Sequence, residues 1–138
     1  MDKSEIQNQI TAFVANGQGN VISAAQAIDE SCIGLRMYDA PLVGFADVHD
    51  PYFAQLLQPG VIGPHFKLPQ AWLENAQTVI SVFLPFCDAV IRSNAKNMDW
   101  PSNEWLHARI EGQAFINQLC AYVRDTLSES GYDAIAPS

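Results

Sequence analysis

A single long helix is the feature that most constrains how this chain can fold. The sequence from Ser102 to Ser130 is predicted to be helical, with Ser102 as the N-cap residue and Gly131 as the residue that ends the helix. At about 100° per residue, its large apolar side chains project to one face. That face is predicted to carry Trp105, Ile116, Leu119, Val123 and Leu127, with Cys120 beside them. The opposite, polar face is predicted to carry His107, Glu111, Gln118, Asp125 and Glu129.

The rest of the chain alternates predicted strands with shorter helices. Strands are predicted at residues 42–47 and 78–85, and the second is expected to be central in a sheet because it is apolar on both faces. Residues 132–136 are expected to form a final short strand, and shorter helices are predicted at 4–15 and after Asp50. The sequence therefore predicts an α/β or α+β fold. Residues 1–138 are expected to form one domain, in which helices pack on a small mixed sheet and the long helix precedes the last strand.

Composition argues against several classes of function. Seven Lys and Arg against fifteen Asp and Glu give a net charge of −8 without a cationic cluster, so direct nucleic-acid binding is not expected. No apolar run approaches the roughly 20 residues of a membrane span, and no apolar signal region follows Met1, so a cytoplasmic location is expected. The spacing of Cys32, Cys87 and Cys120 does not suit a disulfide framework or a cluster. Cys87 and Cys120 lie in apolar stretches and are expected to be reduced and buried.

Arg109 is the ionisable residue that the helical periodicity singles out. It projects onto the predicted apolar face, where an unpaired charge would be very costly. It is therefore expected either to form a structural ion pair or to anchor an anionic ligand, which Gly112 would allow to approach the backbone. His107 and Glu111, at i and i+4, are expected to be a solvated pair. Glu104 and His107 match half of a di-iron E-x-x-H set whose second copy is missing, so no metal site is predicted.

Two loops carry further polar candidates. Asp47, His49 and Asp50 follow a predicted strand, where α/β proteins often place ligand sites, although helix and turn capping alone explains such aspartates. His65 lies in a loop rich in Gly and Pro and could line a pocket. The sequence contains no nucleophile elbow and no Ser-His-Asp order typical of hydrolases.

Several phrases of the sequence together resemble a known family. They are DAPLVGFAD, GVIGPHF, TVISVFLPF, PSNEWLHARIEGQAF and GYDAIAP, and the likeness runs from about residue 30 onward. The chain resembles the amino-terminal region of iron–sulfur proteins related to epoxyqueuosine reductase. The resemblance implies a cobalamin-binding α/β domain, followed in the family by a segment with two four-iron clusters. It also implies that an acidic residue early in the long helix protonates a modified tRNA base, and Glu111 looks equivalent, although its neighbours depart from the family's R-D-Y-H pattern.

Two hypotheses of function follow. The leading one is a cobalamin-binding-type module of an epoxyqueuosine reductase-like protein, inactive as an isolated chain and without an iron–sulfur cluster, because the cluster cysteines have no counterparts. Glu111 is then the predicted catalytic residue, and Arg109, Gly112 and His65 are the predicted cofactor-binding residues. The alternative is a stand-alone ligand-binding or interaction module without enzymatic activity, which forms a homodimer through an exposed sheet edge.

Overall fold

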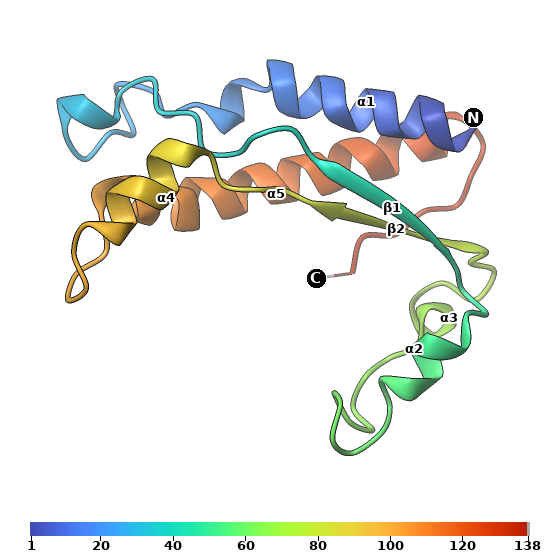
Figure 1. The fold of residues 1–138 in the computed structure, drawn as a ribbon. Coiled ribbons are helices and arrows are strands. Elements are labelled where there is room, and N and C mark those ends of the chain that lie inside the picture. The colour runs from blue at the N-terminus through green and yellow to red at the C-terminus, as the bar shows by residue number, and fades with distance from the viewer. Residues whose placement is uncertain (138) are drawn as a thin grey trace.

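Helix α5 (Asn103–Glu129) is the longest element of the computed structural model, and α1, α4 and the β1–β2 pair lie along it (Figure 1). The structure describes residues 1–137. The Ser102 hydroxyl accepts a hydrogen bond from the Trp105 backbone N–H (3.1 Å), which caps the first turn. Gly131, with φ of 87°, lets the chain turn away after the last one. The predicted long helix and the residues that begin and end it are confirmed.

Shorter helices and two strands complete the part of the chain that the structure describes. The helices are α1 (Lys3–Asn16), α2 (Pro51–Gln55), α3 (Pro69–Trp72) and α4 (Asp88–Ala95), with 3-10 turns η1 (Gln18–Asn20) and η2 (Glu30–Cys32). The strands are β1 (Leu42–Asp47) and β2 (Thr78–Phe83). The predicted combination of helices with a sheet and a long C-terminal helix is confirmed.

The predicted third strand at 132–136 is wrong, because these residues have no regular secondary structure. The Tyr132 backbone N–H donates to the Leu127 carbonyl (3.0 Å), so the chain folds back onto the end of α5. Among residues 1–137, the sheet then consists of β1 and β2 alone, paired antiparallel. The predictions of a mixed sheet and of a central strand at 78–85 are therefore also wrong.

The β1–β2 ribbon connects the helices with an arm that projects from them. Its register runs from Leu42 opposite Phe83 to Asp47 opposite Thr78. Residues 48–77, which include α2 and α3, form the arm, and Figure 1 shows it turning away from α1 and α5. Because two paired strands are only marginally stable alone, the ribbon depends on packing its inner face on the helices.

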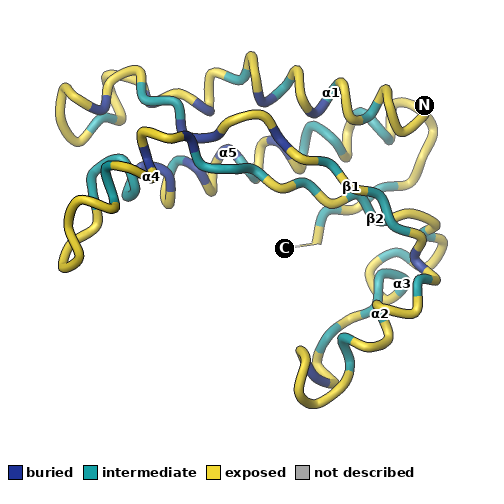
Figure 2. Tube along the Cα trace, viewed as in Figure 1, coloured by how far each residue is buried: buried dark blue, intermediate teal, exposed yellow. Residues whose placement is uncertain are grey.

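A row of aromatic rings joins α1, α5 and the two segments that flank the ribbon, which pair at Tyr38 and Phe86. Ring centroids lie 4.5 Å apart for Phe13 and Tyr122, 5.6 Å for Phe13 and Phe115, 6.2 Å for Phe115 and Tyr38, and 5.3 Å for Tyr38 and Phe86. These separations suit offset-stacked rings, which are favourable beyond the area that they bury. Figure 2 shows buried segments along both α1 and α5. The row therefore runs through the core that holds these elements together.

The predicted apolar face of α5 is confirmed in part, because Leu119 is buried and Trp105, Ile116 and Val123 pack against the core, but the most buried positions lie to one side of it. These positions recur at i, i+4, i+7 and i+11 and are Ala108, Gly112, Phe115 and Leu119, with His107 at the margin. Arg109, predicted to point at the core, is exposed, and so is Cys120, whereas Cys87 is buried as predicted. The reason is that the small residues Ala108 and Gly112 leave room on α5 for the ring of Tyr38. This contact turns the face with the largest side chains partly away from the centre of the core.

Gly112 is a position where α5 and the segment that leads into β1 come into very close contact. A Cβ atom at Gly112 would lie 2.6 Å from the Tyr38 hydroxyl oxygen and 3.2 Å from its Cζ. Tyr38 is held in place because its backbone N–H donates to Oδ1 of the buried Asn20 (2.8 Å), while its carbonyl accepts from Asn20 Nδ2 (2.9 Å). The Tyr38 hydroxyl in turn donates to the Ala108 carbonyl (3.4 Å). The packing therefore requires glycine at position 112.

Substitution of Gly112 tests this contact. Gly112→Ala is expected to lower the free energy of unfolding by about 1–3 kcal/mol, because overpacking outweighs the roughly 1 kcal/mol that alanine ordinarily gains over glycine in a helix. Adding Tyr38→Phe removes the clashing oxygen and is expected to restore part of the loss. Gly44→Ala is the matched control, since its Cβ would enter open space. Urea unfolding measures the three variants and the wild type, and a Gly112→Ala variant more stable than wild type would contradict the contact.

Candidate functional site

The four residues predicted to form a site do not converge on one cavity. Arg109 lies exposed on α5 and makes no ion pair with a residue that the structure describes. Gly112 is covered by Tyr38, so a side chain from the segment before β1 occupies the space expected for a ligand. His65 is exposed in the arm, which Figure 1 shows projecting away from α5. Glu111 is the remaining member, and it contacts a residue that the prediction left out.

The positive charge of the exposed Arg109 influences the pKa of the buried Tyr38 hydroxyl. Burial raises the pKa of the Tyr38 hydroxyl, and the positive charge of Arg109 lowers it in part. The expected structural ion pair of Arg109 is wrong for the described residues, because the side chain is solvated and needs no partner carboxylate. Its predicted role as an anchor for an anionic ligand stays a prediction.

His107 and Glu111 are not the solvated pair that the helical pattern predicts. His107 is 2% exposed, and its Nε2 accepts a hydrogen bond from the Ile28 backbone N–H (3.1 Å). Its Nδ1 lies 3.0 Å from Oε2 of Glu111. Because Nε2 accepts, the imidazole proton lies on Nδ1, which donates to the Glu111 carboxylate. The pair is buried because the segment around Ile28 folds over the start of α5, a contact between residues far apart in the sequence.

This arrangement holds a loop in place and uses both ring nitrogens of His107. A general base needs an accepting nitrogen within reach of a substrate proton, and the accepting nitrogen of His107 is used by Ile28. One oxygen of Glu111 is likewise used to orient the imidazole. The role of Glu111 as a proton donor, which the family resemblance implies, stays a prediction.

Asp29 provides a second link between the same loop and α5. Its carboxylate accepts hydrogen bonds from the Ser31 backbone N–H (2.7 Å), from the Ser31 hydroxyl, and from Asn103 Nδ2 (2.9 Å). The bonds from Ser31, followed by the bond from Asn103, hold the pKa of the Asp29 carboxyl below its ordinary value. Together with His107, Asp29 fastens the loop to the first two turns of α5. Sequence patterns did not indicate this link, because its partners are far apart in the chain.

Asp47, at the end of β1, and Asp50, just after it, act as caps. Asp47 Oδ1 accepts from the His49 backbone N–H (2.8 Å), and Asp50 Oδ1 accepts from the Tyr52 backbone N–H (2.9 Å) at the start of α2. The predicted N-cap role of Asp50 is confirmed. Capping thus accounts for one oxygen of each aspartate, and the second oxygen of each remains open to other contacts.

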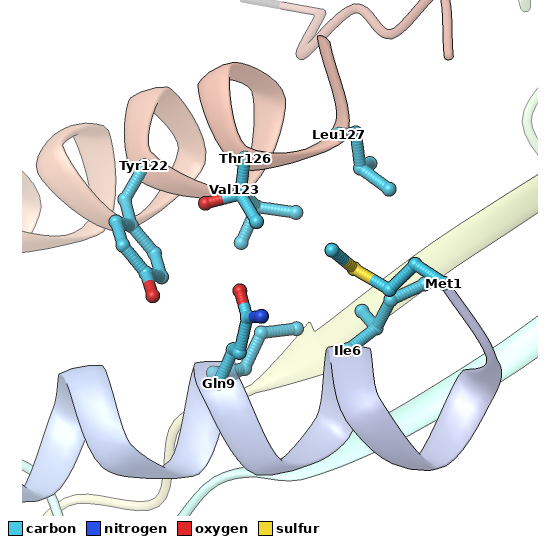
Figure 3. Close-up of a pocket in the computed structure, with 8 residues that line it drawn as sticks. Met1, Ile6, Gln9, Tyr122, Val123, Thr126 and Leu127 are labelled. Carbon is cyan, nitrogen blue, oxygen red and sulfur yellow. The ribbon is translucent and has the colours of Figure 1, made fainter. Parts of the chain in front are cut away.

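Two cavities bear on ligand binding. One lies between α1 and α5 and measures about 10 Å³, room for about one water molecule (Figure 3). Figure 3 shows Met1, Tyr122 and Leu127 among the side chains around it. The other is an open hollow of about 180 Å³ at the base of the arm, smaller than the ~300–1,000 Å³ of typical small-molecule sites. We call it the arm hollow, and it is lined by Ala46, Asp50, Tyr52, Phe53 and Leu56.

The face of the ribbon that points away from the helices is the most open apolar surface of the sheet. Side chains alternate along each strand, so one face of the ribbon, called here the outer face, carries Leu42, Gly44, Ala46, Val79, Ser81 and Phe83. Leu42 and Phe83 are direct cross-strand partners, yet they are 65% and 62% exposed. The sequence did not reveal this surface, because an apolar pattern on both faces is also that of a central strand.

Substitution of His107 separates its structural role from that of its neighbour Arg109. His107→Leu is expected to lower the free energy of unfolding by about 1–3 kcal/mol, because it leaves the Ile28 N–H without an acceptor. His107→Gln keeps an acceptor and is expected to lose less, while the exposed Arg109→Met is expected to change stability by no more than about 0.5 kcal/mol. Hydrogen exchange at the Ile28 amide is the local readout. Unchanged exchange in His107→Leu would contradict the bond.

Comparisons with known proteins add no relative. No protein-family model matches the chain, and no characterised protein or solved structure matches it. Among residues 1–137, no helix is long and apolar enough to cross a membrane, and no three His, Cys, Asp or Glu side chains are placed to share a metal ion. The reductase-like function therefore stays a prediction from sequence phrases, and the surfaces of the molecule carry the inference of function.

Proposed function

We propose that this chain is a non-catalytic module that binds another protein through the outer face of the β1–β2 ribbon. The cross-strand pair Leu42 and Phe83 carries the proposal, since both side chains are more than half exposed although they lie opposite each other in a sheet. Exposed apolar residues that lie side by side mark interaction sites more often than single ones do. The inner face of the same ribbon is packed on the core, as Val43, Ile80 and Val82 contact it.

The rest of the outer face supports the same role. Gly44 and Ser81 lie opposite each other, so the middle of the outer face carries only small side chains. A Cβ atom at Gly44 would meet nothing within 4 Å, which shows that the space above it is open. No charged side chain belongs to this face, so a partner can cover it without leaving a charge unpaired. Each strand also has one side without a partner strand among the described residues, where an added strand could pair.

The polar side chains support binding rather than catalysis. His107, the histidine of α5, uses one ring nitrogen to hold the Ile28 loop and the other to bind Glu111. Asp29, Asp47 and Asp50 cap turns or helices. A cytoplasmic location is part of the proposal, and the three cysteines, which are unpaired in the structure, support it because disulfides are rare in that compartment.

The cobalamin-binding role of an epoxyqueuosine reductase-like module is a second proposal. The sequence phrases that resemble this family support it. The placement of its predicted ligands does not, because Arg109 is exposed on α5, Gly112 lies under Tyr38, and His65 belongs to the arm. These residues do not fit a single cradle for so large a cofactor, so the binding module is the function that the geometry favours.

Partner capture tests the outer face. The double variant Leu42→Lys/Phe83→Lys is expected to lose at least about tenfold in the amount of each specific partner recovered from a lysate of the source organism, because charges replace the apolar centre of the surface. Ile91→Lys/Ile110→Lys is the matched control, with two exposed apolar side chains on α4 and α5 given the same charge change. Recovery equal for both double variants would contradict the proposal. Urea unfolding checks that each variant stays folded.

A spectroscopic titration separates the two proposals. Adding the purified chain to cob(II)alamin is expected to leave the absorption spectrum of the cofactor unchanged, because the predicted ligands do not converge and the two cavities described above are far too small for it. Serum albumin at equal concentration serves as the control for non-specific effects. A saturable spectral change that Arg109→Met abolishes would instead support the reductase-like module and count against a purely protein-binding role.

A further inference from the structure

We propose that the outer face and the arm hollow together bind an extended, cationic segment of another protein. One apolar side chain of that segment fills the arm hollow, and a neighbouring Lys or Arg lies beside Asp50. This inference rests on the proposed binding role of the outer face and names the chemistry of its partner.

The outer face and the arm hollow form one continuous surface. Ala46 belongs to both, since it alternates to the same side of β1 as Leu42 and also lines the hollow. Ala46 pairs across the ribbon with Val79, so the hollow begins where the outer face ends. A segment that covers Leu42 and Phe83 and continues along the ribbon therefore reaches the hollow.

The size and lining of the hollow suit a side chain rather than a small molecule. A volume of about 180 Å³ lies below that of ordinary ligand pockets, and three of its five lining residues are the large apolar or aromatic Tyr52, Phe53 and Leu56. Tyr52 is 71% exposed and so is available to a partner. Asp50 lines the same hollow, and only its Oδ1 is used by the α2 cap, which leaves its other oxygen for a cation.

The net negative charge of the ribbon and the arm favours a partner that carries positive charge. Between residues 38 and 86, which cover the ribbon and the arm, the carboxylates are Asp39, Asp47, Asp50 and Glu74. The same segment contains one lysine, Lys67, whose ammonium lies 4.7 Å from the centre of the Trp72 ring, and Lys3 of α1 brings a second ammonium to 5.6 Å from the centre of the Phe45 ring. The four carboxylates still outnumber these two cations. A second copy of the chain would bring the same excess of carboxylates, and a further net charge of −8, against this surface. A cationic partner is attracted by the same charges, so electrostatic complementarity favours it over self-association.

Peptide selection tests the inference without a known partner. A phage-displayed library of random peptides is selected on the immobilised chain, with free Leu42→Lys/Phe83→Lys protein added to remove peptides that bind elsewhere. Enriched peptides are expected to combine aromatic or aliphatic residues with an excess of Lys and Arg. An enriched peptide is then labelled and its affinity is measured by fluorescence anisotropy at low and high salt. The affinity is expected to fall with salt, because salt screens the attraction between the carboxylates of this region and the charges of the peptide.

Two pairs of matched variants locate the peptide. Tyr52→Ala is expected to weaken binding by about tenfold, whereas Trp100→Ala, which removes a 75% exposed aromatic ring elsewhere, changes it less than about twofold. Asp50→Asn keeps an N-cap for α2 but removes the charge, and it is expected to weaken binding by about fivefold. Glu129→Gln removes one exposed carboxylate from α5 and controls for net charge.

Each other outcome overturns the inference in an identifiable way. Failure to enrich any peptide, enrichment of peptides without a cationic excess, or equal effects of Asp50→Asn and Glu129→Gln would all contradict a cationic segment at the arm hollow. A doubled mass in light scattering that Leu42→Lys reverses would assign the surface to a second copy. If partner capture still depends on Leu42 and Phe83 in these cases, the proposed binding role stands. If that dependence is absent as well, the two proposals fail together.

Discussion

The contact between Tyr38 and Gly112 determines how the segment that leads into the β1–β2 ribbon lies on the long helix. The buried Asn20 fixes the Tyr38 backbone through two hydrogen bonds, and the missing side chain at position 112 leaves space for the ring. From that ring the aromatic row extends to α1 through Phe115 and Phe13. Because interiors are close-packed, this single close approach sets the rotation of α5, and with it the side chains that reach the surface.

The ionisable residues of α5 illustrate how packing changes the meaning of a sequence. His107 and Glu111 look like an exposed pair at i and i+4, yet the loop around Ile28, 79 residues before His107, covers the histidine and makes it part of the core. Asp29 fastens the same loop through Asn103. In an open cleft the His107 imidazole would suggest catalysis. Here it holds two segments together, because both of its ring nitrogens form hydrogen bonds.

Function is better sought where the molecule leaves apolar groups uncovered. The ribbon is anchored by its inner face, which leaves its outer face and the adjoining arm hollow uncovered. Figure 1 shows the arm projecting away from α1 and α5. Parts of this region were predictable, including both strands, the turn after β1 and the capping role of Asp50. Its exposure was not, because Leu42 and Phe83 would be equally apolar in the middle of a larger sheet. The number of strands in a sheet is not a local property of any one strand.

The sequence by itself determined the features that depend on near neighbours in the chain. Ser102 and Gly131 define the ends of α5, Asp50 and Pro51 begin α2, and the charge balance makes the ribbon and arm acidic, because caps, turns and charges act over a few residues. Only the tertiary structure decided which face of α5 is buried, that Arg109 is solvated, and that residues 132–136 pair with no strand. Those outcomes depend on a ring fitting against a glycine and on a loop covering a histidine, contacts that helical periodicity does not encode.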